Sequence, residues 1–367
     1  MKIAIFHNFM DNIGGAEKVT LILARELNAE LYTTNIDLEK IKKMGFSDLN
    51  IFSIGKIPIN PPFRQQLALW KFRHLNLKKK YDFYIISGDW AMSGTVKNKP
   101  NLWYVHSPIR EIWDLYENVR NNIVSQERFP KLKIFLFDIW VHYNRYLSRK
   151  YVKHAMKLIS SSKNVQTKVK RFLDRKSTVI HPPTEISKFH YSKNGDFWLS
   201  VNRLSTQKNI ELQIKTFKKL PNEKLIIAGP YENSRHITLY RRHLESTLPD
   251  NVTLISFATY DELIHLYANC KGFITTAKDE DYGMTPVEAM ASGKPVIAPN
   301  EGGYKETIID GITGKLIENI NVDKLVEAIK EVGKNPKSYK NACLKQSKKF
   351  DTKIFIKKIK ENINSSR

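Results

Sequence analysis

The stretch from Lys271 to Ala298 reads KGFITTAKDEDYGMTPVEAMASGKPVIA and contains two short apolar runs, separated by a polar loop and a helical pattern. The runs lie within Lys271–Thr275 and Pro295–Ala298, and such unbroken apolar runs are typical of parallel strands covered on both faces. Two parallel strands need a crossover connection, usually a helix, and the residues between the runs can supply one. The stretch therefore predicts a strand–helix–strand unit of an α/β fold.

Two glutamates, Glu280 and Glu288, lie on either side of the predicted helix start. Thr285 suits the N-cap, Pro286 suits the first helical position, and Glu288 lies where a capping-box acid belongs. A helix start behind the flexible Gly283 directs backbone N–H groups and the positive end of the helix dipole at one point, which suits a phosphate. Glu280 can accept hydrogen bonds from hydroxyls beside it, so the loop favours a nucleotide-sugar site. The alternative is a plain capping box beside a solvated acid.

The acidic triplet Asp279-Glu280-Asp281 also resembles a metal-binding motif. Its position ahead of a phosphate-type helix start argues against a metal, because the helix terminus already supplies positive potential. We therefore expect no metal ligands in this loop.

The alternation of strand and helix runs through the chain twice. The other predicted strands are, in order, Lys2–Phe6, Glu30–Thr34, Ile51–Ser53, Tyr84–Ser87, Leu102–His106, Leu158–Ser160, Thr178–Ile180, Phe197–Val201, Lys224–Ala228 and Val252–Ile255. Pro182-Pro183 breaks the pattern and is predicted to be a linker. We expect two doubly wound Rossmann-like domains that face a cleft, over residues 1–183 and 184–345, and a C-terminal helix over 346–367 that could pack back on the first domain.

Composition is that of a soluble globular protein with a strong positive charge. The 367 residues carry a formal net charge of +23 and only two cysteines, which favours a reducing compartment. The first residues are too short an apolar run for a signal peptide, and no window reaches the roughly 20 apolar residues of a membrane span. We expect a cytoplasmic protein, or one peripheral on the cytoplasmic face of a membrane.

The positive charge is concentrated between Lys131 and Lys176, where thirteen Lys or Arg face only Asp138 and Asp174. Such a region attracts polyanions, including anionic lipid headgroups, nucleic acid and phosphate-bearing substrates. Within it, Leu132–Trp140 is apolar and aromatic enough to lie against a lipid interface. The alternatives are a surface that serves solubility and an apolar face that packs into its own domain. Because the chain has no nucleic-acid-binding signature, nucleic acid is an unlikely partner and a membrane is favoured.

Polar residues that follow other predicted strands are further site candidates. Arg203 and Lys208 follow Phe197–Val201 and would hold a diphosphate, the Arg as a planar fork and the Lys as a point charge. His106 ends a strand of the first half and could contact a transferred sugar, although a lone histidine is more often structural. Asp89 is a weaker candidate at a neighbouring strand end.

Gly14-Gly15 follows the first strand and could let backbone N–H groups approach a phosphate or an acceptor. The pair lacks the full GxGxxG dinucleotide pattern, so it could equally be a tight turn before a helix.

Taken together, these motifs resemble glycosyltransferase family 4, the retaining enzymes of the GT-B fold. The resemblance is carried by Glu280 and Glu288 with seven residues between them, by Arg203 with Lys208, and by Gly14-Gly15-Ala16-Glu17. It is reinforced by Gly302-Gly303, Glu306 and Gly311–Gly314. A likeness to the mannosyltransferases of bacterial polysaccharide assembly is carried by His106–Arg110 followed by Trp113-Asp114, and by Ser162–Val165 leading to Val179–Pro183.

The resemblance implies a role for each matched residue. Arg203 and Lys208 would bind the donor diphosphate, with help from the backbone of Gly15 and of Gly283, Met284 and Thr285. Glu288 would hold ribose hydroxyls, Glu280 the sugar hydroxyls, and His106 a sugar hydroxyl from the other domain. Asp281-Tyr282 replaces the more usual Gly-Phe of the family.

The expected function is that of a metal-independent hexosyltransferase. It would move a hexose, with mannose as the first candidate, from a GDP- or UDP-linked donor to a saccharide or a lipid-linked acceptor in glycan or polysaccharide biosynthesis, without a further cofactor. The alternatives are a nucleotide-sugar epimerase of the same fold and a non-catalytic polyanion-binding protein. Donor, acceptor, linkage and oligomeric state are not specified by the sequence.

Overall fold

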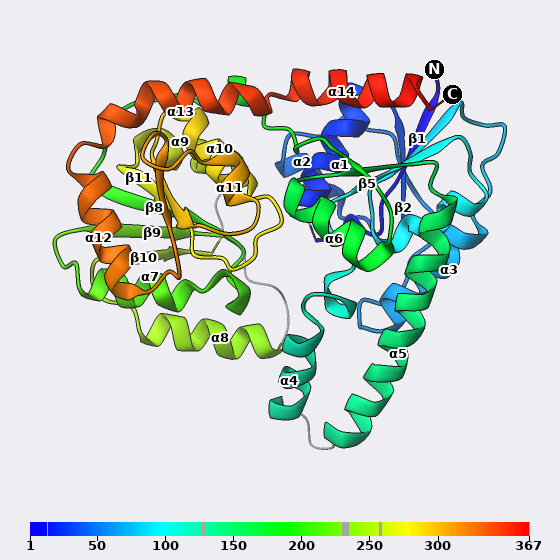
Figure 1. Cartoon of the computed structure of the whole chain (residues 1–367), viewed down its shortest axis with the longest axis horizontal. Coiled ribbons are helices and arrows are strands. Elements are labelled where there is room, and N and C mark those ends of the chain that lie inside the picture. Colours follow the sequence, from blue (N-terminus) through cyan, green and yellow to red (C-terminus); the bar gives the residue numbers. More distant parts are fainter. Residues whose placement is uncertain (13, 127–129, 230–234, 257–258, 367) are drawn as a thin grey trace. The chain divides into compact units, whose positions relative to one another are not determined.

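The computed structural model describes all residues except 13, 127–129, 230–234, 257–258 and 367. The chain forms two compact units, and each is built on one parallel sheet with helices on its faces (Figure 1). Unit 1 comprises Met1–His181 together with Ile356–Arg367, and unit 2 comprises Pro182–Phe355. The two units are described separately below.

Unit 1 contains a seven-stranded sheet with the order β3-β2-β1-β4-β5-β6-β7, and all of its strand pairs are parallel. Its strands are β1 (Ile3–Phe6), β2 (Glu30–Thr33), β3 (Ile51–Ser53), β4 (Phe83–Ile86), β5 (Asn101–Val105), β6 (Lys157–Ser160) and β7 (Thr178–Val179). The strand order reverses between β1 and β4, so the connections that leave these two neighbours run toward opposite edges of the sheet. In doubly wound sheets this reversal opens a crevice at the carboxyl ends of the strands.

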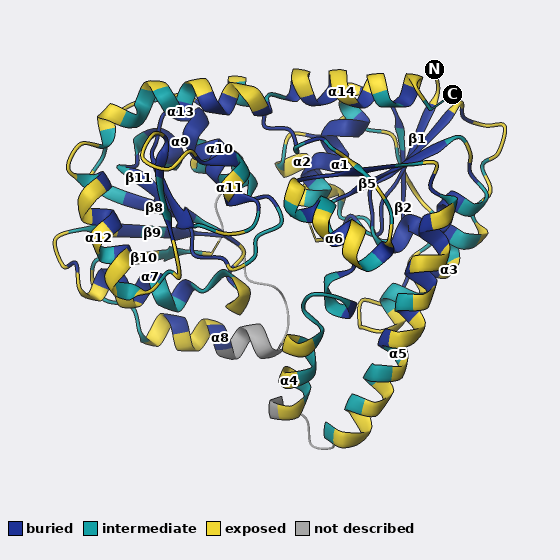
Figure 2. Ribbon diagram, viewed as in Figure 1, coloured by how far each residue is buried: buried dark blue, intermediate teal, exposed yellow. Residues whose placement is uncertain are grey.

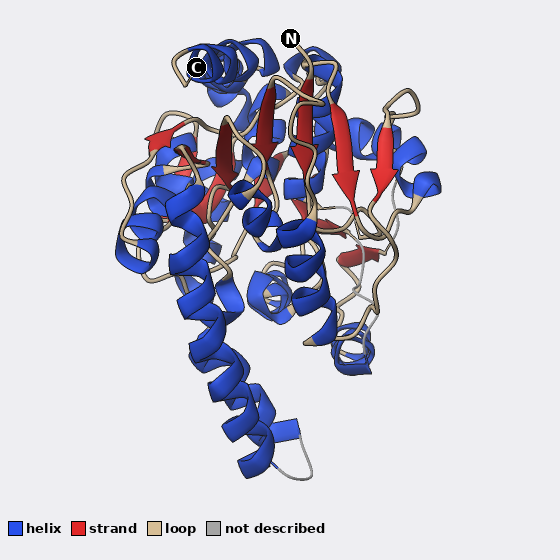
Figure 3. Cartoon of the chain, turned by 90° about the vertical axis from the view of Figure 1, so that its right-hand side faces the viewer, coloured by secondary structure: helices blue, strands red, loops and turns tan. Residues whose placement is uncertain are grey.

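The α-helices of unit 1 are α1 (Gly15–Glu26), α2 (Leu38–Lys43), α3 (Phe63–His74), α4 (Tyr116–Gln126), α5 (Pro130–Tyr151), α6 (Lys163–Leu173) and most of α14 (Thr352–Asn364). Helices α4 and α5 form a hairpin inserted between β5 and β6. Figure 3 shows that α5 extends well past the carboxyl edge of the sheet. The end of α14 is tied to the unit by a hydrogen bond of 2.8 Å from Lys157 Nζ to Ser365 Oγ.

Unit 2 contains a six-stranded sheet with the order β10-β9-β8-β11-β12-β13, again entirely parallel. Its strands are β8 (Phe197–Val201), β9 (Lys224–Ala228), β10 (Val252–Ile255), β11 (Gly272–Ile274), β12 (Val296–Pro299) and β13 (Gly314–Ile317). Its α-helices are α7 (Ile210–Lys218), α8 (Arg235–Ser246), α9 (Tyr260–Asn269), α10 (Met284–Ala291), α11 (Tyr304–Thr307), α12 (Val322–Gly333) and α13 (Lys340–Ser347). The order reverses between β8 and β11.

The central strands of both sheets are buried on both faces (Figure 2). Every residue of β1, β4 and β12 is buried, which explains why these segments are unbroken apolar runs. In unit 2 the two faces pack into separate apolar clusters, one around Trp198 and Ile274 and one around Leu199 and Phe273. Charged side chains that could meet a ligand are therefore expected beyond the strand ends.

The predicted α/β fold is confirmed, and the predicted strands are found within one or two residues of their expected ends. Strand β13 was not predicted, because its sequence GKLI is short and half polar. One local prediction is wrong. The N-cap of α10 is Gly283, with φ of +79°, and not Thr285, so Pro286 lies inside the first turn and Glu288 is not part of a capping box.

The backbone of unit 2 leaves no room for a side chain at Gly314, and this generates a stability prediction. A Cβ atom at Gly314, where φ is +151°, would lie 1.8 Å from the carbonyl oxygen of Val296 on the neighbouring strand. Gly314→Ala should therefore cost about 3 kcal/mol or more in the free energy of unfolding, measured in urea.

The matched control is Gly311→Ala. Gly311 has φ of +72°, and among the described residues no atom would lie within 4 Å of a Cβ placed on it. In this variant only backbone strain should lower the free energy of unfolding, by about 1 kcal/mol. Equal losses in the two variants would contradict the packing argument.

Candidate active site

In unit 2, Lys208 and Glu280 form an ion pair, with 2.6 Å between Lys208 Nζ and Glu280 Oε2. Lys208 lies in the loop after β8, and Glu280 lies in the loop after β11. Because β8 and β11 are the neighbours at which the strand order reverses, the pair lies at the crevice that this topology opens. Both side chains are about one-fifth exposed, so the pair is accessible and only partly screened by water.

The loop that carries Lys208 is held by hydrogen bonds to Thr276. The Thr276 hydroxyl lies 2.9 Å from the carbonyl oxygen of Lys208 and 3.0 Å from that of Asn209, and it also accepts a bond of 2.9 Å from Gln213 Nε2. Asn209 adopts a left-handed conformation with φ of +51°. These buried contacts fix the turn from which the lysine extends.

The loop that carries Glu280 packs against Gly302-Gly303. The Gly303 amide donates to the carbonyl oxygen of Glu280 at 2.8 Å, and a Cβ atom on Gly302 would lie 2.4 Å from that same oxygen. At the other side of the loop, a Cβ atom on Gly283 would lie 2.6 Å from the ring of Tyr304. The close contacts explain why glycines occupy these positions, and they fix the backbone around Glu280.

Glu288 is buried inside α10 and accepts a hydrogen bond of 3.0 Å from the hydroxyl of Tyr267. It does not cap its own helix, so its carboxylate is not divided between capping and another ligand. The first amides of α10, including those of Met284 and Thr285, have no acceptor within the helix, because they belong to its first turn. Glu288 lies in the same helix, one turn beyond them.

Arg203 lies in the loop between β8 and α7, as its position in the sequence predicts, and its side chain is exposed. It shares this loop with Lys208, at the carboxyl end of β8. Sequence position thus brings both cations to one edge of the unit 2 sheet.

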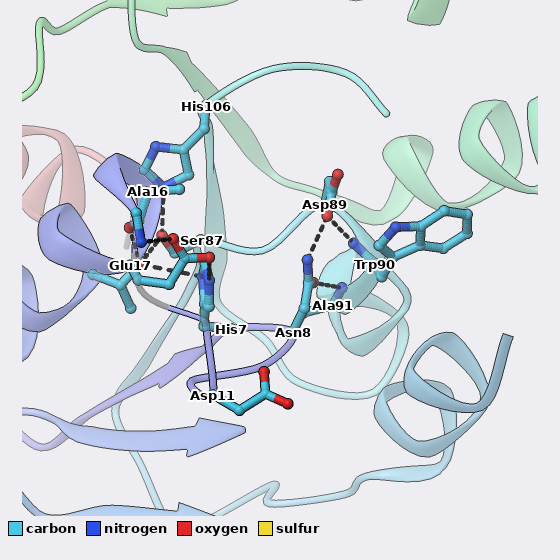
Figure 4. A network of polar contacts seen from close by, with 12 residues as sticks. His7, Asn8, Asp11, Ala16, Glu17, Ser87, Asp89, Trp90, Ala91 and His106 are labelled. Carbon is cyan, nitrogen blue, oxygen red and sulfur yellow. Dashed lines mark hydrogen bonds and ion pairs between the residues drawn. The ribbon is translucent and has the colours of Figure 1, made fainter. Parts of the chain in front are cut away.

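In unit 1, a network of polar side chains joins the carboxyl ends of β1, β4 and β5 (Figure 4). The His106 Nε2 atom lies 2.8 Å from Ser87 Oγ, which lies 2.6 Å from Thr20 Oγ1. Thr20 Oγ1 lies 3.2 Å from His7 Nδ1, and His7 Nε2 lies 3.2 Å from Glu17 Oε1. The network therefore runs from the end of β5 to helix α1.

The hydrogen positions in this network follow from one carbonyl group. Thr20 Oγ1 lies 2.8 Å from the carbonyl oxygen of Ala16, which can only accept, so the Thr20 hydroxyl donates to it. Ser87 then donates to Thr20 and accepts from Nε2 of His106. Burial and the neighbouring His7 lower the pKa of His106 to about 3, so its ring is neutral near pH 7. The neutral ring then presents Nδ1 as a hydrogen-bond acceptor.

Gly14 and Gly15 begin helix α1 within this network. The Gly14 amide donates to Glu17 Oε2 at 2.8 Å, so the Glu17 carboxylate satisfies the N-cap amide, and Gly15 is the first residue of the helix. Burial alone would raise the pKa of Glu17, but its hydrogen bond to His7 and the two amide bonds outweigh this, and the pKa is lowered. Gly15 thus lies at a helix start, close to the polar network.

Two acids lie at the same edge of unit 1. Asp89 accepts from Asn8 Nδ2 and from the Trp90 amide, and burial raises its pKa. Glu111 lies on a single 3-10 turn (Arg110–Ile112), and burial, then Asp89 and Asp114, raise its pKa to about 7.

His7, Glu17, Ser87 and Glu111 were not among the predicted site residues. The first three each follow or face the end of a predicted strand, so their position near a strand end could have been predicted. Their contacts with one another could not, because these depend on which strands are neighbours in the sheet. For Glu111 no local signal exists.

Two doubly wound parallel sheets, each with charged and polar side chains at the point where its strand order reverses, are the architecture of the GT-B fold. Residues 183–350 match the sequence family of glycosyl transferases group 1. The chain is 25% identical over 417 aligned positions to alpha-1,3/1,6-mannosyltransferase ALG2 of Dictyostelium discoideum, covering all of this chain and 97% of that protein. ALG2 of Candida glabrata is also 25% identical, over 93% of this chain and 87% of its own length.

Solved structures agree on the fold. Anabaena Alr3699/HepE in complex with UDP-glucose superposes with a TM-score of 0.77 at 18% identity and covers both chains fully. The chain is a glycosyltransferase with the GT-B fold, and its residues 183–350 are similar to the group 1 glycosyl transferases. The comparisons do not favour the epimerase and polyanion-binding alternatives.

The raised pKa of Glu111 generates a prediction of pH dependence. Between pH of about 4.5 and 7 the folded protein holds a proton on Glu111 that the unfolded chain has released, so this group makes stability fall as pH rises. The slope is at most about 1.4 kcal/mol per pH unit. Glu111→Gln should remove it, so the difference in unfolding free energy between variant and wild type should grow in favour of the variant from pH 5 to 7.

The control for this measurement is Glu39→Gln, in the same unit, since Glu39 is exposed. Its difference from wild type should not change over this range of pH. A pH-independent difference for Glu111→Gln would contradict the assignment.

Proposed function

We propose that the chain transfers a hexosyl group, with mannose as the first candidate, from a GDP- or UDP-linked donor to a hydroxyl of a saccharide or lipid-linked acceptor, with retention of configuration and without a metal ion. The reaction would serve glycan or polysaccharide biosynthesis. The mannosyl assignment is supported by the likeness to ALG2 mannosyltransferases. The observation that carries the proposal is the Lys208–Glu280 pair at the strand-order reversal of unit 2.

The Lys208 ammonium group has three donors, and one of them is directed at Glu280. The remaining donors can bind diphosphate oxygens while the ion pair keeps the lysine in place. Arg203 on the same loop and the first amides of α10 (Gly283, Met284 and Thr285) add positive potential. A leaving diphosphate can be stabilised by these groups, which is why no metal ion is required in the proposed mechanism.

Glu280 and Glu288 would hold hydroxyls. Glu280 keeps acceptor capacity beyond its bond to Lys208 and would bind hydroxyls of the transferred sugar. Glu288, already fixed by Tyr267, would bind the ribose hydroxyls of the donor. From unit 1, the neutral His106 would accept a hydrogen bond from a sugar hydroxyl at Nδ1, and Gly15 would offer its helix-terminal amide.

Among the described residues, none is an evident nucleophile for the chemical step. The bond between the sugar C1 and the phosphate oxygen breaks, and the acceptor oxygen forms its bond to C1 on the same face. The acceptor proton goes to an oxygen of the leaving diphosphate, so atoms and charges balance. Fixed cations contribute most when charge develops on the leaving group, because they then stabilise the transition state more than the ground state.

Substitution of Lys208 tests this role. Lys208→Ala should lower kcat by about 10²–10³-fold, the effect of removing one fixed donor at a developing anion. Because the pair is only about one-fifth exposed, its loss leaves Glu280 without this partner, so urea unfolding of the variant is measured alongside turnover to confirm that it folds. Turnover is measured with a panel of nucleotide-sugars, with magnesium and with EDTA.

The control is Lys224→Ala, which removes another lysine–carboxylate pair of 2.6 Å in unit 2, to Asp196, far more exposed. This variant should keep full activity. Unchanged turnover in Lys208→Ala, or turnover that requires magnesium, would overturn the corresponding part of the proposal.

Donor identity and stereochemistry need separate measurements. A donor present at a hundred times its Kd should stabilise the wild-type protein by about 2.7 kcal/mol, which is visible as a shift of Tm. The anomeric proton signal of the first product, followed by NMR, should show the configuration of the donor. An inverted product would contradict a retaining mechanism.

A further inference from the structure

Helix α5 exposes an apolar ridge along most of its length. The exposed side chains recur at helical spacing and fall on one face of the helix, and they are Leu132, Phe135, Leu136, Ile139, Tyr143 and Tyr146. Phe135 is 61% exposed although it is a large apolar side chain. Phe137 and Trp140, from the same segment, instead pack against the core of unit 1. The sequence stretch therefore divides into a packed face and an exposed one.

Helix α3 adds a second apolar ridge beside the first. Its exposed residues Phe63, Leu67 and Trp70 are spaced at i, i+4 and i+7 and so share one face. The two helices are joined by a hydrogen bond of 2.8 Å from Gln66 Nε2 to Asn144 Oδ1. Between them lies an open, mostly apolar cavity of about 500 Å³, lined among others by Leu67, Trp70 and Tyr143.

Lysines flank this apolar surface at both ends of α5. Lys131 and Lys133 are exposed in its first turn, and Lys150 and Lys153 are exposed at and just after its end. Arg73, which lines the cavity, adds a further basic side chain. A face with an apolar centre and a cationic margin matches the interface of an anionic bilayer.

Within the described residues, none of the helices combines the length and the apolarity that crossing a bilayer requires. An apolar face of this kind would therefore contact a bilayer from one side. A second copy of the chain is a poorer fit, because a self-complementary contact would bring two cationic margins together in a chain with a net charge of +23.

We propose that the α3–α5 face of unit 1 docks on an anionic lipid bilayer, with the ridges of both helices in the interface and the cavity between Trp70 and Tyr143 occupied by a lipid acyl chain. The tip of α5 lies past the carboxyl edge of the unit 1 sheet (Figure 3), which is the edge at which the His106 network is found. A lipid-linked acceptor would then approach that network from the bilayer. This last point rests on the proposed function, whereas docking itself does not.

The test is co-sedimentation with vesicles, together with tryptophan fluorescence, using the full chain. Vesicles of phosphatidylcholine with roughly 30% phosphatidylglycerol, which have a negative surface potential, are compared with vesicles of pure phosphatidylcholine, which have none. All six tryptophans lie in described segments and only Trp70 is exposed, so the blue shift on binding should come from Trp70 and vanish in Trp70→Phe. Binding should weaken steeply as salt is raised.

Matched variants separate the apolar and the electrostatic contributions. The triple variant Phe135→Ser, Leu136→Ser, Ile139→Ser should bind anionic vesicles at least tenfold more weakly, and Ile312→Ser, an exposed apolar residue of unit 2, should bind like wild type. Lys131→Glu with Lys133→Glu should lose about fivefold or more per charge removed, whereas the exposed pair Lys337→Glu with Lys345→Glu should lose less.

Three outcomes would overturn the proposal. In the first, wild type and triple variant bind neutral and anionic vesicles equally well. In the second, the protein binds RNA but not vesicles. In the third, no vesicle binding is seen, and the wild type is a dimer whereas the triple variant is a monomer. Because all readouts are of binding, they are independent of transferase activity. If the wild-type protein binds vesicles but shows no turnover with soluble acceptors, that result counts against the proposed function and not against docking.

Discussion

A parallel strand that is buried on both faces can present charged side chains to a ligand only beyond its ends, and in doubly wound sheets the ligand lies at the carboxyl ends. This constraint governs both units, since the central strands β1, β4 and β12 are buried throughout. It drives the charged and polar groups of each unit to one edge of its sheet. The reversal of strand order, between β1 and β4 and between β8 and β11, then separates the loops at that edge so that side chains from two strands can meet.

The two edges differ in chemistry. In unit 2 the edge carries a lysine, an arginine, a glutamate and the start of α10, all of which suit an anionic ligand that also has hydroxyls. In unit 1 it carries a hydrogen-bonded network with a neutral histidine and two acids of raised pKa, Asp89 and Glu111, which suits uncharged hydroxyls. The division corresponds to a donor side and an acceptor side in the proposed reaction.

The strands and the loops that follow them could be predicted from the sequence, because unbroken apolar runs have few other interpretations. For the same reason Lys208, Glu280 and His106 could be placed at strand ends, although their roles remain predictions. Strand β13 escaped because its four residues are half polar. The N-cap of α10 was placed wrongly, since Thr285 has the right side chain but Gly283 has the backbone freedom that the turn requires. The His7–His106 network depends on which strands are neighbours, and no single segment contains that information.

Gly302 and Gly303 lie against the backbone of Glu280 and Tyr282, with distances that exclude even a methyl group on either glycine. Two loops that are about twenty positions apart in the chain therefore share a single conformation. A residue change at Asp281 or Tyr282 that shifts the backbone has to be matched in the glycine loop, and a change in the glycine loop displaces the glutamate. In the proposed function, in which Glu280 holds the sugar, a change of sugar preference would therefore require paired substitutions in these two loops.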